Sequence, residues 1–356
     1  MRQFIEGKTV LVTGGTGSIG SEIVRQVLRF DPKMVRVLSR TEHMQHTLMQ
    51  ELGRLPNLVC FIGDVRNAER LNRAAVEADV IFHVAAMKHV PLCEFNPFEA
   101  VETNVIGAQN VVNAAINNRV KQVVAISTDK AANPMNVMGG TKLLAEKLFT
   151  SAHHYAGVSG TKFACVRFGN VLGSRGSVVP MWIDQLAKGH PVALTDPDMT
   201  RFFLSIPQAV SLVFKAMRRM VGGEIFILKM PVMRLGDLAE AVIERFAPAQ
   251  GVDPAMVERK VIGIRPGEKM YELLMSEDEA GIALEVEDMF IIPPHIEIPN
   301  RGLMRRTYEG AKPAPKTAYD SRRDLPLGRR AIQDMLGLTY SREDRTGDRQ
   351  PVPVSA

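Results

Sequence analysis

Residues 9–20 read TVLVTGGTGSIG, and this stretch decides the fold. A β-rich run comes first, and a helical pattern over Gly20–Arg29 follows the glycines. In such a strand–turn–helix, one glycine permits a tight turn, one lets the backbone approach a pyrophosphate and one lets the helix pack closely. Gly14, Gly17 and Gly20 occupy those places. Because the helix N-terminus then faces negative charge, we expect a dinucleotide site rather than a glycine-rich turn without a ligand.

The first half of the chain goes on to alternate short apolar runs with helical patterns. Further strands are expected over Val35–Leu38, Val59–Ile62, Val80–Val84 and Val123–Ser127. Helices are expected between them, over Glu42–Leu52, Ala68–Ala75, Pro97–Asn117 and Gly139–His154. Because this alternation builds βαβ units with right-handed crossovers, the pattern predicts a doubly wound parallel sheet.

The second half, beyond about Arg167, is less regular. A short strand and two helices are expected there, over Glu224–Leu228, Leu235–Ala247 and Met270–Leu274. The fold class is therefore α/β: a doubly wound parallel Rossmann sheet with a smaller C-terminal α/β substrate lobe. The expected divisions are a dinucleotide-binding core over 1–166, a lobe over 167–298 from which the chain can return to the core, and a basic, proline-rich tail over 299–356. This tail is expected to be partly disordered, above all after Tyr340.

Composition narrows the class of protein. The 356 residues are 46% hydrophobic, enough for a full core, and the net charge is +5. The basic residues are scattered among few aromatic residues, which argues against a nucleic-acid partner. No run of 18 apolar residues and no signal peptide is found, so no membrane span is expected. Cys60, Cys93 and Cys165 lack metal or disulfide spacing, and no HExxH motif occurs, so we expect no metal and a cytoplasmic setting.

The residues with the most distinctive chemistry follow the strand that ends near Ser127. The sequence STDKAANP starts at that serine, and MGGTK starts at Met138. Ligands bind at the carboxyl ends of strands in open α/β sheets, so a site is expected with Thr128, Asp129 and Lys130. Lys142 lies four residues after Met138, so both share one helix face. An exposed loop ion pair is the alternative for the aspartate and lysine, and the strand end favours the site.

The end of the second strand bears on the choice of cofactor. An acidic residue there would bind the ribose hydroxyls of NAD. Ser39 and Arg40 stand there instead, and an arginine can pair with the 2′-phosphate of NADP. We therefore expect NADP. The alternative is a solvated Arg40, with Glu42 on the ribose of NAD.

The glycine spacing GxxGxxG resembles that of the extended short-chain dehydrogenase/reductase superfamily. From about residue 8 to residue 294 the chain resembles one family in it: the UDP-N-acetylglucosamine 4,6-dehydratases, polysaccharide biosynthesis proteins of bacterial surface-glycan synthesis. The motifs that carry this resemblance are AMKHVP at 86–91, TDKAANP at 128–134, NVMG at 136–139, RFGNVLGS at 167–174, MTRF at 199–202 and RPGEK at 265–269.

One position departs from the usual superfamily pattern. Short-chain dehydrogenases carry Tyr-x-x-x-Lys, and here Met138 takes the tyrosine position ahead of Lys142. A thioether cannot exchange a proton usefully. Some members of the resembled family also carry methionine there, so the resemblance implies an active enzyme in which Thr128, Asp129 and Lys130 do the acid–base work. Many of these methionine-bearing members carry a membrane anchor, and we expect a soluble form here.

The resemblance implies contacts with both ligands. Asp64 is expected against the adenine, and Ala85 and Ala86 behind the cofactor. The cofactor set is Thr13, Gly14, Gly17, Ser18, Ile19, Gly20, Ser39, Arg40, Asp64, Val65, Ala85, Ala86, Lys88, Asn104, Ser127 and Lys142. Arginines are suited to clamp the diphosphate. The substrate set, which makes the second lobe a nucleotide-sugar lobe, is Lys88, Asn170, Arg175, Arg201, Arg265 and Glu268.

The implied reaction converts UDP-N-acetylglucosamine to a UDP-4-keto-6-deoxy sugar, with a tightly bound NADP (or NAD) that is regenerated in each turnover. Hydride leaves C4, water is lost across C5 and C6, and hydride returns to C6. We expect Lys130 to be the C5 base, Asp129 the acid for the C6 hydroxyl and Thr128 the partner of O4. A lysine base needs a lowered pKa, which burial or a neighbouring cation such as Lys142 would provide.

Three alternatives stay open at this point. The chain can be a dehydratase that also inverts C5, a 4-epimerase acting on a UDP-N-acetylhexosamine, or a non-catalytic NADP-binding regulatory protein that is degenerate at Met138. A 4-epimerase has no need of an acid–base pair after Thr128. A homo-oligomer is also expected, because the helices over Pro97–Asn117 and Gly139–His154 pair subunits in the superfamily.

Overall fold

The computed structural model describes residues 1–294 and 308–340. Strands β1 (Thr9–Thr13) and β4 (Val80–His83) are buried at every position, as befits a parallel sheet covered on both faces. They form the centre of the main sheet. The other parallel strands of this sheet are β2 (Met34–Ser39), β3 (Leu58–Ile62), β5 (Gln122–Thr128), β6 (Lys162–Phe168) and β10 (Glu224–Leu228).

The strand order of the main sheet is β16-β14-β15-β10-β6-β5-β4-β1-β2-β3. The first three of these pair antiparallel: β14 (Leu284–Val286), β15 (Met289–Ile292) and β16 (Lys312–Pro313). The chain therefore runs outward from β1 to β3 and then returns to β4 and outward the other way. This order confirms the doubly wound α/β fold and puts a crevice at the carboxyl ends of β1 and β4.

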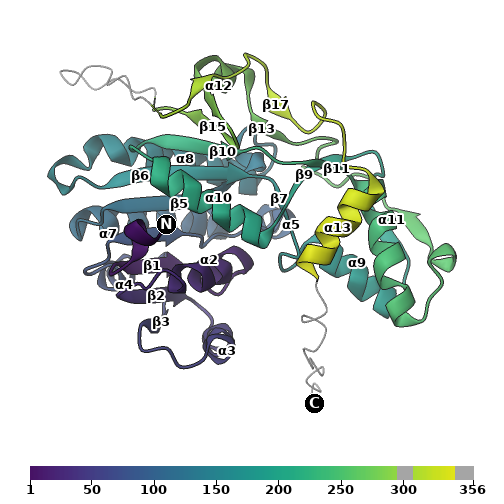
Figure 1. Ribbon diagram of the computed structural model, residues 1–356, viewed down its shortest axis with the longest axis horizontal. Helices are drawn as coiled ribbons and strands as arrows, with labels where there is room; N and C mark the ends of the chain where they lie inside the picture. The colour runs from purple at the N-terminus through teal and green to yellow at the C-terminus, as the bar shows by residue number, and fades with distance from the viewer. Residues whose placement is uncertain (295–307, 341–356) are drawn as a thin grey trace.

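Helices pack in layers on the sheet (Figure 1). One group consists of α2 (Ser18–Leu28) and α10 (Ile206–Arg219), which pack on each other. In a second group, α7 (Gly107–Asn117) packs between α4 (Ala68–Ala74) and α8 (Val137–Tyr155). The helix expected over Pro97–Asn117 is interrupted by a π-helical turn at Glu102–Ile106. The remaining helices of this half are α1 (Arg2–Ile5), α3 (Glu42–Leu52), α5 (Val90–Phe95) and α6 (Pro97–Val101), and 3₁₀ turns cover Asp129–Ala131 and Gly157–Ser159.

A second apolar cluster forms the smaller lobe, with the fully buried Trp182 and Leu238 in it. Its helices are α9 (Val178–Ala187), α11 (Leu235–Phe246) and α13 (Arg329–Thr339), and α13 lies along α11 (Figure 1). Its strands are β7 (Asn170–Leu172), β9 (Thr200–Ser205) and β11 (Val232–Arg234) in one sheet and β8 (Val192–Leu194) with β12 (Arg259–Val261) in another. Two 3₁₀ turns, Pro248–Gln250 and Pro254–Met256, connect α11 to β12.

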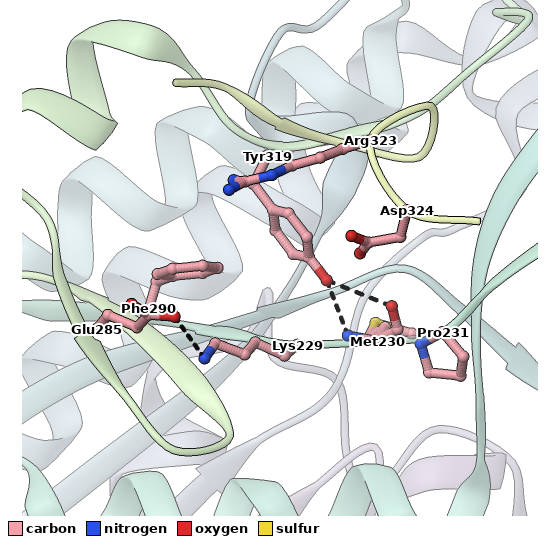
Figure 2. Close-up of a pocket in the computed structure, with 8 residues that line it drawn as sticks. All are labelled: Lys229, Met230, Pro231, Glu285, Phe290, Tyr319, Arg323 and Asp324. Atoms are coloured by element: carbon pink, nitrogen blue, oxygen red, sulfur yellow. Dashed lines mark hydrogen bonds and ion pairs between the residues drawn. The ribbon is translucent and has the colours of Figure 1, made fainter. Parts of the chain in front are cut away.

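The chain returns from this lobe to the core, and part of the expected tail is ordered structure. Strand β17 (Tyr319–Asp320) pairs antiparallel with β13 (Leu273–Met275), which precedes α12 (Glu277–Ile282). The Tyr319 hydroxyl accepts from the Met230 N–H at 3.0 Å and donates to the Met230 carbonyl at 3.3 Å, which anchors this segment (Figure 2). The disorder expected after Tyr340 lies outside the described residues.

The helix expected over Met270–Leu274 is wrong. Residues 262–272 have no regular structure, and β13 starts at Leu273 because it pairs with a strand nearly fifty residues further along the chain. A buried arginine holds this region against the sheet. Arg167 on β6 donates to both carboxylate oxygens of Glu146 on α8, at 3.0 and 2.7 Å, and to both of Glu279 on α12, at 2.9 and 3.0 Å.

Candidate active site

A cavity of about 950 Å³ opens at the carboxyl ends of the parallel strands. It runs from the glycine-rich turn and the end of β2 across to the end of β5 and the loop after β6. Most of the residues expected in the site line it. From the cofactor set these are Gly14, Gly17, Ser18, Ile19, Ser39, Arg40, Asp64, Val65, Ala85, Ala86, Lys88, Ser127 and Lys142, and from the substrate set Lys88, Asn170 and Arg175. The residues expected at the catalytic centre also line it: Thr128, Asp129 and Lys130 after β5, and Met138 and Lys142 on one helix face.

The glycine-rich turn leaves no room for a side chain at Gly14 or at Gly20. Gly14 has a φ of +67°, and a Cβ on it would lie 2.7 Å from the backbone nitrogen of Ala85. A Cβ on Gly20 would lie 2.3 Å from the Gly14 carbonyl oxygen. Helix α2 begins directly after Gly17, which offers no side-chain cap, so its first N–H groups face the cavity. The turn therefore has the close backbone approach and the positive helix end that a pyrophosphate needs.

Unpaired polar atoms mark the same cavity. Buried polar atoms in proteins are normally hydrogen-bonded. Among the residues that the structure describes, five buried side-chain oxygens in the cavity wall have no such partner: Thr103 Oγ1, Ser127 Oγ, Asp129 Oδ2, Asn170 Oδ1 and Ser177 Oγ. Their number along one cleft fits a long polar ligand that would satisfy them, as a dinucleotide beside a nucleotide sugar would.

The far end of the cavity carries the groups expected around the adenosine. Ser39 is fixed by Gln45, whose side-chain amide donates to the Ser39 hydroxyl and carbonyl at 3.0 Å each. Arg40 is exposed beside it. Asp64 accepts from the Arg66 N–H at 2.9 Å and its Nε at 3.0 Å. Burial alone would raise the pKa of Asp64, but the hydrogen bonds and charge of Arg66 outweigh it and lower the pKa.

Three residues of the cofactor set lie behind the wall and not in it. Thr13 Oγ1 is 2.8 Å from Nδ1 of the buried His83, and Gly20 supports the turn. The Asn104 side chain accepts from the Met87 N–H at 2.8 Å and donates to the Met87 carbonyl at 3.0 Å and to Thr141 at 3.0 Å. Asn104 therefore shapes the loop after β4 and has no donor or acceptor aimed at the cavity.

The acid–base residues expected from the sequence lie together at the end of β5. Asp129 is fully buried, and its Oδ1 accepts from the Thr128 hydroxyl at 2.7 Å and the Lys130 N–H at 2.9 Å. The Lys130 ammonium group also donates to that oxygen, at 3.1 Å. In an extended strand, adjacent side chains point to opposite faces. The 3₁₀ turn over Asp129–Ala131 instead lets them converge.

A residue that the sequence analysis did not identify completes this group. Glu272 Oε1 lies 3.2 Å from Lys130 Nζ, and only 3% of the residue is exposed. The lowered pKa expected for Lys130 is wrong: burial alone would lower it, but the carboxylates of Asp129 and Glu272 outweigh burial and raise it above the ordinary lysine value. The sequence signal for Glu272 was the RPGEK motif just before it, but the helix expected there gave no reason to place it near Lys130.

Met138 and Lys142 lie on one face of α8, as expected. Met138 packs with Cys93 and Ala100 and contributes its side chain to the cavity wall. Lys142 donates to the Ile126 carbonyl at 2.6 Å, and burial lowers its pKa. Asn136 caps this helix by accepting from the Gly139 N–H at 2.8 Å, and its amide donates to the Gly267 carbonyl at 3.0 Å.

The residues expected to bind the substrate separate into two groups. Lys88 donates to the Arg175 carbonyl at 2.8 Å, and the Arg175 N–H donates to Ser18 Oγ at 3.0 Å, so the loop after β7 lies over the glycine-rich turn. Arg201, Arg265 and Glu268 do not line the cavity. The expectation that Arg201 clamps phosphate does not hold here, because its buried guanidinium donates to protein carbonyls, including Lys269 O at 2.7 Å, and lies 3.7 Å from Glu268 and Glu272.

Residues 10–294 match the family described as polysaccharide biosynthesis protein. The chain belongs to that family. It is 57% identical to an uncharacterized membrane protein, MJ1061, of Methanocaldococcus jannaschii, over 82% of this chain and 87% of that one. It is 43% identical to a UDP-N-acetylglucosamine 4,6-dehydratase (inverting) of Campylobacter jejuni, covering 82% and 84%. A UDP-glucose 4-epimerase of Rickettsia massiliae is 41% identical, covering 80% and 83%.

A solved structure also resembles this chain over nearly its whole length. Pen from Bacillus thuringiensis superposes with a TM-score of 0.87 at 45% identity, covering 94% of this chain and 98% of Pen. These comparisons confirm the expected family and an enzyme of the group of nucleotide-sugar dehydratases and epimerases. In the described residues, no helix is long and apolar enough to cross a membrane, and no three histidine, cysteine or acidic side chains gather as a metal site would require.

Proposed function

We propose that the chain is a UDP-N-acetylglucosamine (UDP-GlcNAc) 4,6-dehydratase that works with a bound nicotinamide dinucleotide. The observation that carries the proposal is the Asp129–Lys130 pair, a carboxylate and an ammonium group 3.1 Å apart in the cavity wall at the end of β5. A 4-epimerase exchanges only hydride and a hydroxyl proton and has no use for this pair. The name of the Campylobacter jejuni relative supports UDP-GlcNAc as the substrate.

The reaction needs both hydride and proton transfer. A nicotinamide dinucleotide held by the glycine-rich turn and Lys142 would supply the hydride chemistry, by which hydride leaves C4 of the sugar and returns to C6. The C4 ketone acidifies the proton on C5, so a base at C5 and an acid at the C6 hydroxyl can together remove water. By our assignment Lys130 is the base and Asp129 the acid.

One proton held by the pair is enough for this step. The structure has an ammonium and a carboxylate, and transfer of the proton across the 3.1 Å contact gives an amine and a carboxylic acid. The Lys130 amine then takes the C5 proton, while Asp129 gives its proton to the departing C6 hydroxide, which leaves as water. The pair ends as ammonium and carboxylate, the form in which it began.

Neighbouring residues support the pair. The Thr128 hydroxyl, which donates to Asp129 Oδ1 at 2.7 Å, is free to turn to the sugar O4 once that carboxyl carries the proton. Lys142 is assigned to the cofactor ribose, and Met138 to a purely apolar wall. We assign NADP as the cofactor because Arg40 is exposed at the cavity edge next to Ser39, where a 2′-phosphate would lie. NAD, with Glu42 on its ribose, is the alternative.

A second candidate rests on the relatives named UDP-glucose 4-epimerase. Incubation of the protein with UDP-GlcNAc and NADP⁺ or NAD⁺ distinguishes the two, because a dehydratase product is lighter by one water and an epimerase product is not. Proton NMR of the keto sugar then gives the configuration at C5. We expect Lys130→Ala to lower the rate of water loss by about 10²–10⁴-fold. Full dehydration by that variant would overturn the assignment of the base.

A further inference from the structure

Glu272 lies between the cavity and the C-terminal segment. Its Oε1 is 3.2 Å from Lys130 Nζ and 3.7 Å from Arg201 Nε, and Glu272 is not among the residues that line the cavity. Its Oε2 is buried and has no hydrogen-bond partner among residues 1–294 and 308–340. Lys130 is therefore held between two carboxylates, Asp129 and Glu272, and only Asp129 belongs to the cavity wall.

The backbone of Glu272 is fixed by a residue from the expected tail. Its N–H donates to Ser321 Oγ at 3.0 Å, and the Ser321 N–H donates to the Glu272 carbonyl at 2.9 Å. Ser321 is fully buried, and its hydroxyl also meets Thr200 Oγ1 at 2.8 Å. These hydrogen bonds fix the backbone position from which the Glu272 side chain reaches Lys130.

The charges around Glu272 come from three parts of the chain. Lys130 and Asp129 approach from the end of β5, Arg201 from β9, and Lys269 from the loop before it. Burial raises the pKa of Glu272, and the charge of Asp129 adds to this, while Lys130 and Arg201 oppose it. Removing a carboxylate and an ammonium group from water costs free energy, and their mutual attraction can fall short of offsetting it.

We propose that Glu272 is a positioning residue for Lys130, which fixes the Nζ atom at the cavity wall and raises the proton affinity of the amine that takes the sugar's C5 proton. The role in catalysis rests on the proposed dehydratase function, whereas the effect on Lys130 itself does not. Proton uptake at Lys130 leaves a cation in a low-dielectric site, and the fixed charge of Glu272 is already in place to offset it.

The first test needs no activity. Lysine side chains are labelled with ¹³C at Cε, and the Lys130 signal, assigned by its loss in Lys130→Arg, is followed by NMR against pH. In Glu272→Gln we expect the proton affinity of Lys130 to fall by about tenfold or more. The matched control is Glu277→Gln, the same change on an exposed residue of α12, which should leave the titration unaltered. An unchanged Lys130 titration in Glu272→Gln would overturn the proposal.

The second test measures turnover of UDP-GlcNAc. In Glu272→Gln we expect kcat to fall by about 10²-fold and KM to change by less than about threefold, because Glu272 lies outside the cavity lining. The high-pH limb of kcat, where the Asp129–Lys130 pair loses its one proton, should move to lower pH. Glu272→Asp keeps the charge and should recover part of kcat and the original limb; a Gln variant with the wild-type pH profile contradicts the proposal.

These outcomes separate the two proposals. If wild-type protein removes no water from UDP-GlcNAc, the dehydratase function fails while the NMR titration still tests the contact with Lys130. If wild-type protein is active and both the titration and the pH profile ignore Glu272, the function stands and the inference on Glu272 fails. The melting temperatures of Glu272→Gln, Glu272→Asp and the wild type are compared, so that a folding defect in the Gln variant is detected.

Discussion

At the scale of single residues, Met138 occupies the position where related enzymes use a phenol. It packs against Cys93 and Ala100, and its thioether offers no proton. We expect Met138→Leu, a swap of similar volume, to keep kcat within about threefold, because an apolar wall is all that the position supplies. Steady-state assays with UDP-GlcNAc measure this. A hundredfold loss in kcat with an unchanged melting temperature would mean that the sulfur takes part in the reaction.

Arg40 is the residue on which the choice of cofactor depends. If it pairs with a 2′-phosphate, Arg40→Ala should weaken NADPH binding by about 10- to 100-fold, the usual loss for a hydrogen bond to a charged group, and leave NADH binding nearly unchanged. Fluorescence titration of each reduced dinucleotide gives both constants. Equal weakening of the two would mean that Arg40 does not recognise the 2′-phosphate. The alternative, NAD with Glu42 on its ribose, would then be favoured.

At the scale of elements, the buried Arg167 joins β6, α8 and α12 through the buried carboxylate of Glu146 and the partly exposed carboxylate of Glu279. Removing one partner of such a pair leaves uncompensated buried charge, so Arg167→Leu should cost about 3–5 kcal/mol in the free energy of unfolding. Urea unfolding followed by circular dichroism measures it. Arg73→Leu is the control, because it breaks the exposed ion pair with Glu69, for which we expect about 1 kcal/mol or less. Similar losses in the two variants would show that Arg167 is not the anchor of these elements.

At the scale of the whole molecule, local sequence patterns were enough to predict the parallel sheet, whereas the remaining structure depends on pairing between distant segments. Strand–turn–helix signals placed Gly14 and Lys130 correctly, because both follow strands whose apolar runs are continuous in the sequence. Glu272 could not be found in this way. It precedes β13, which pairs with β17 far along the chain, and the short irregular segments around it carry no periodic signal. Arg201 was misread for the same reason, since its carbonyl partners at 269 and 270 come from that irregular loop.

The stability of the whole fold should depend on pH through His83, which lies at the centre of the sheet. Burial, with a smaller contribution from Lys142, lowers the pKa of His83 to about 3, against an ordinary value of 6.5 in the unfolded chain. Between those pH values the unfolded state binds a proton that the folded state does not bind. The contribution of His83 to the free energy of unfolding is therefore fully present above pH 6.5 and is lost as the pH falls toward 3. For this group alone the loss reaches about 4 kcal/mol at pH 3.

The free energy of unfolding, measured in urea at several pH values, should therefore fall with a slope that His83→Gln reduces by one proton. The glutamine amide can still pair with the Thr13 hydroxyl that contacts Nδ1 in the wild type, so the variant should fold at neutral pH. An identical slope in the two proteins would mean that His83 becomes protonated within the folded sheet.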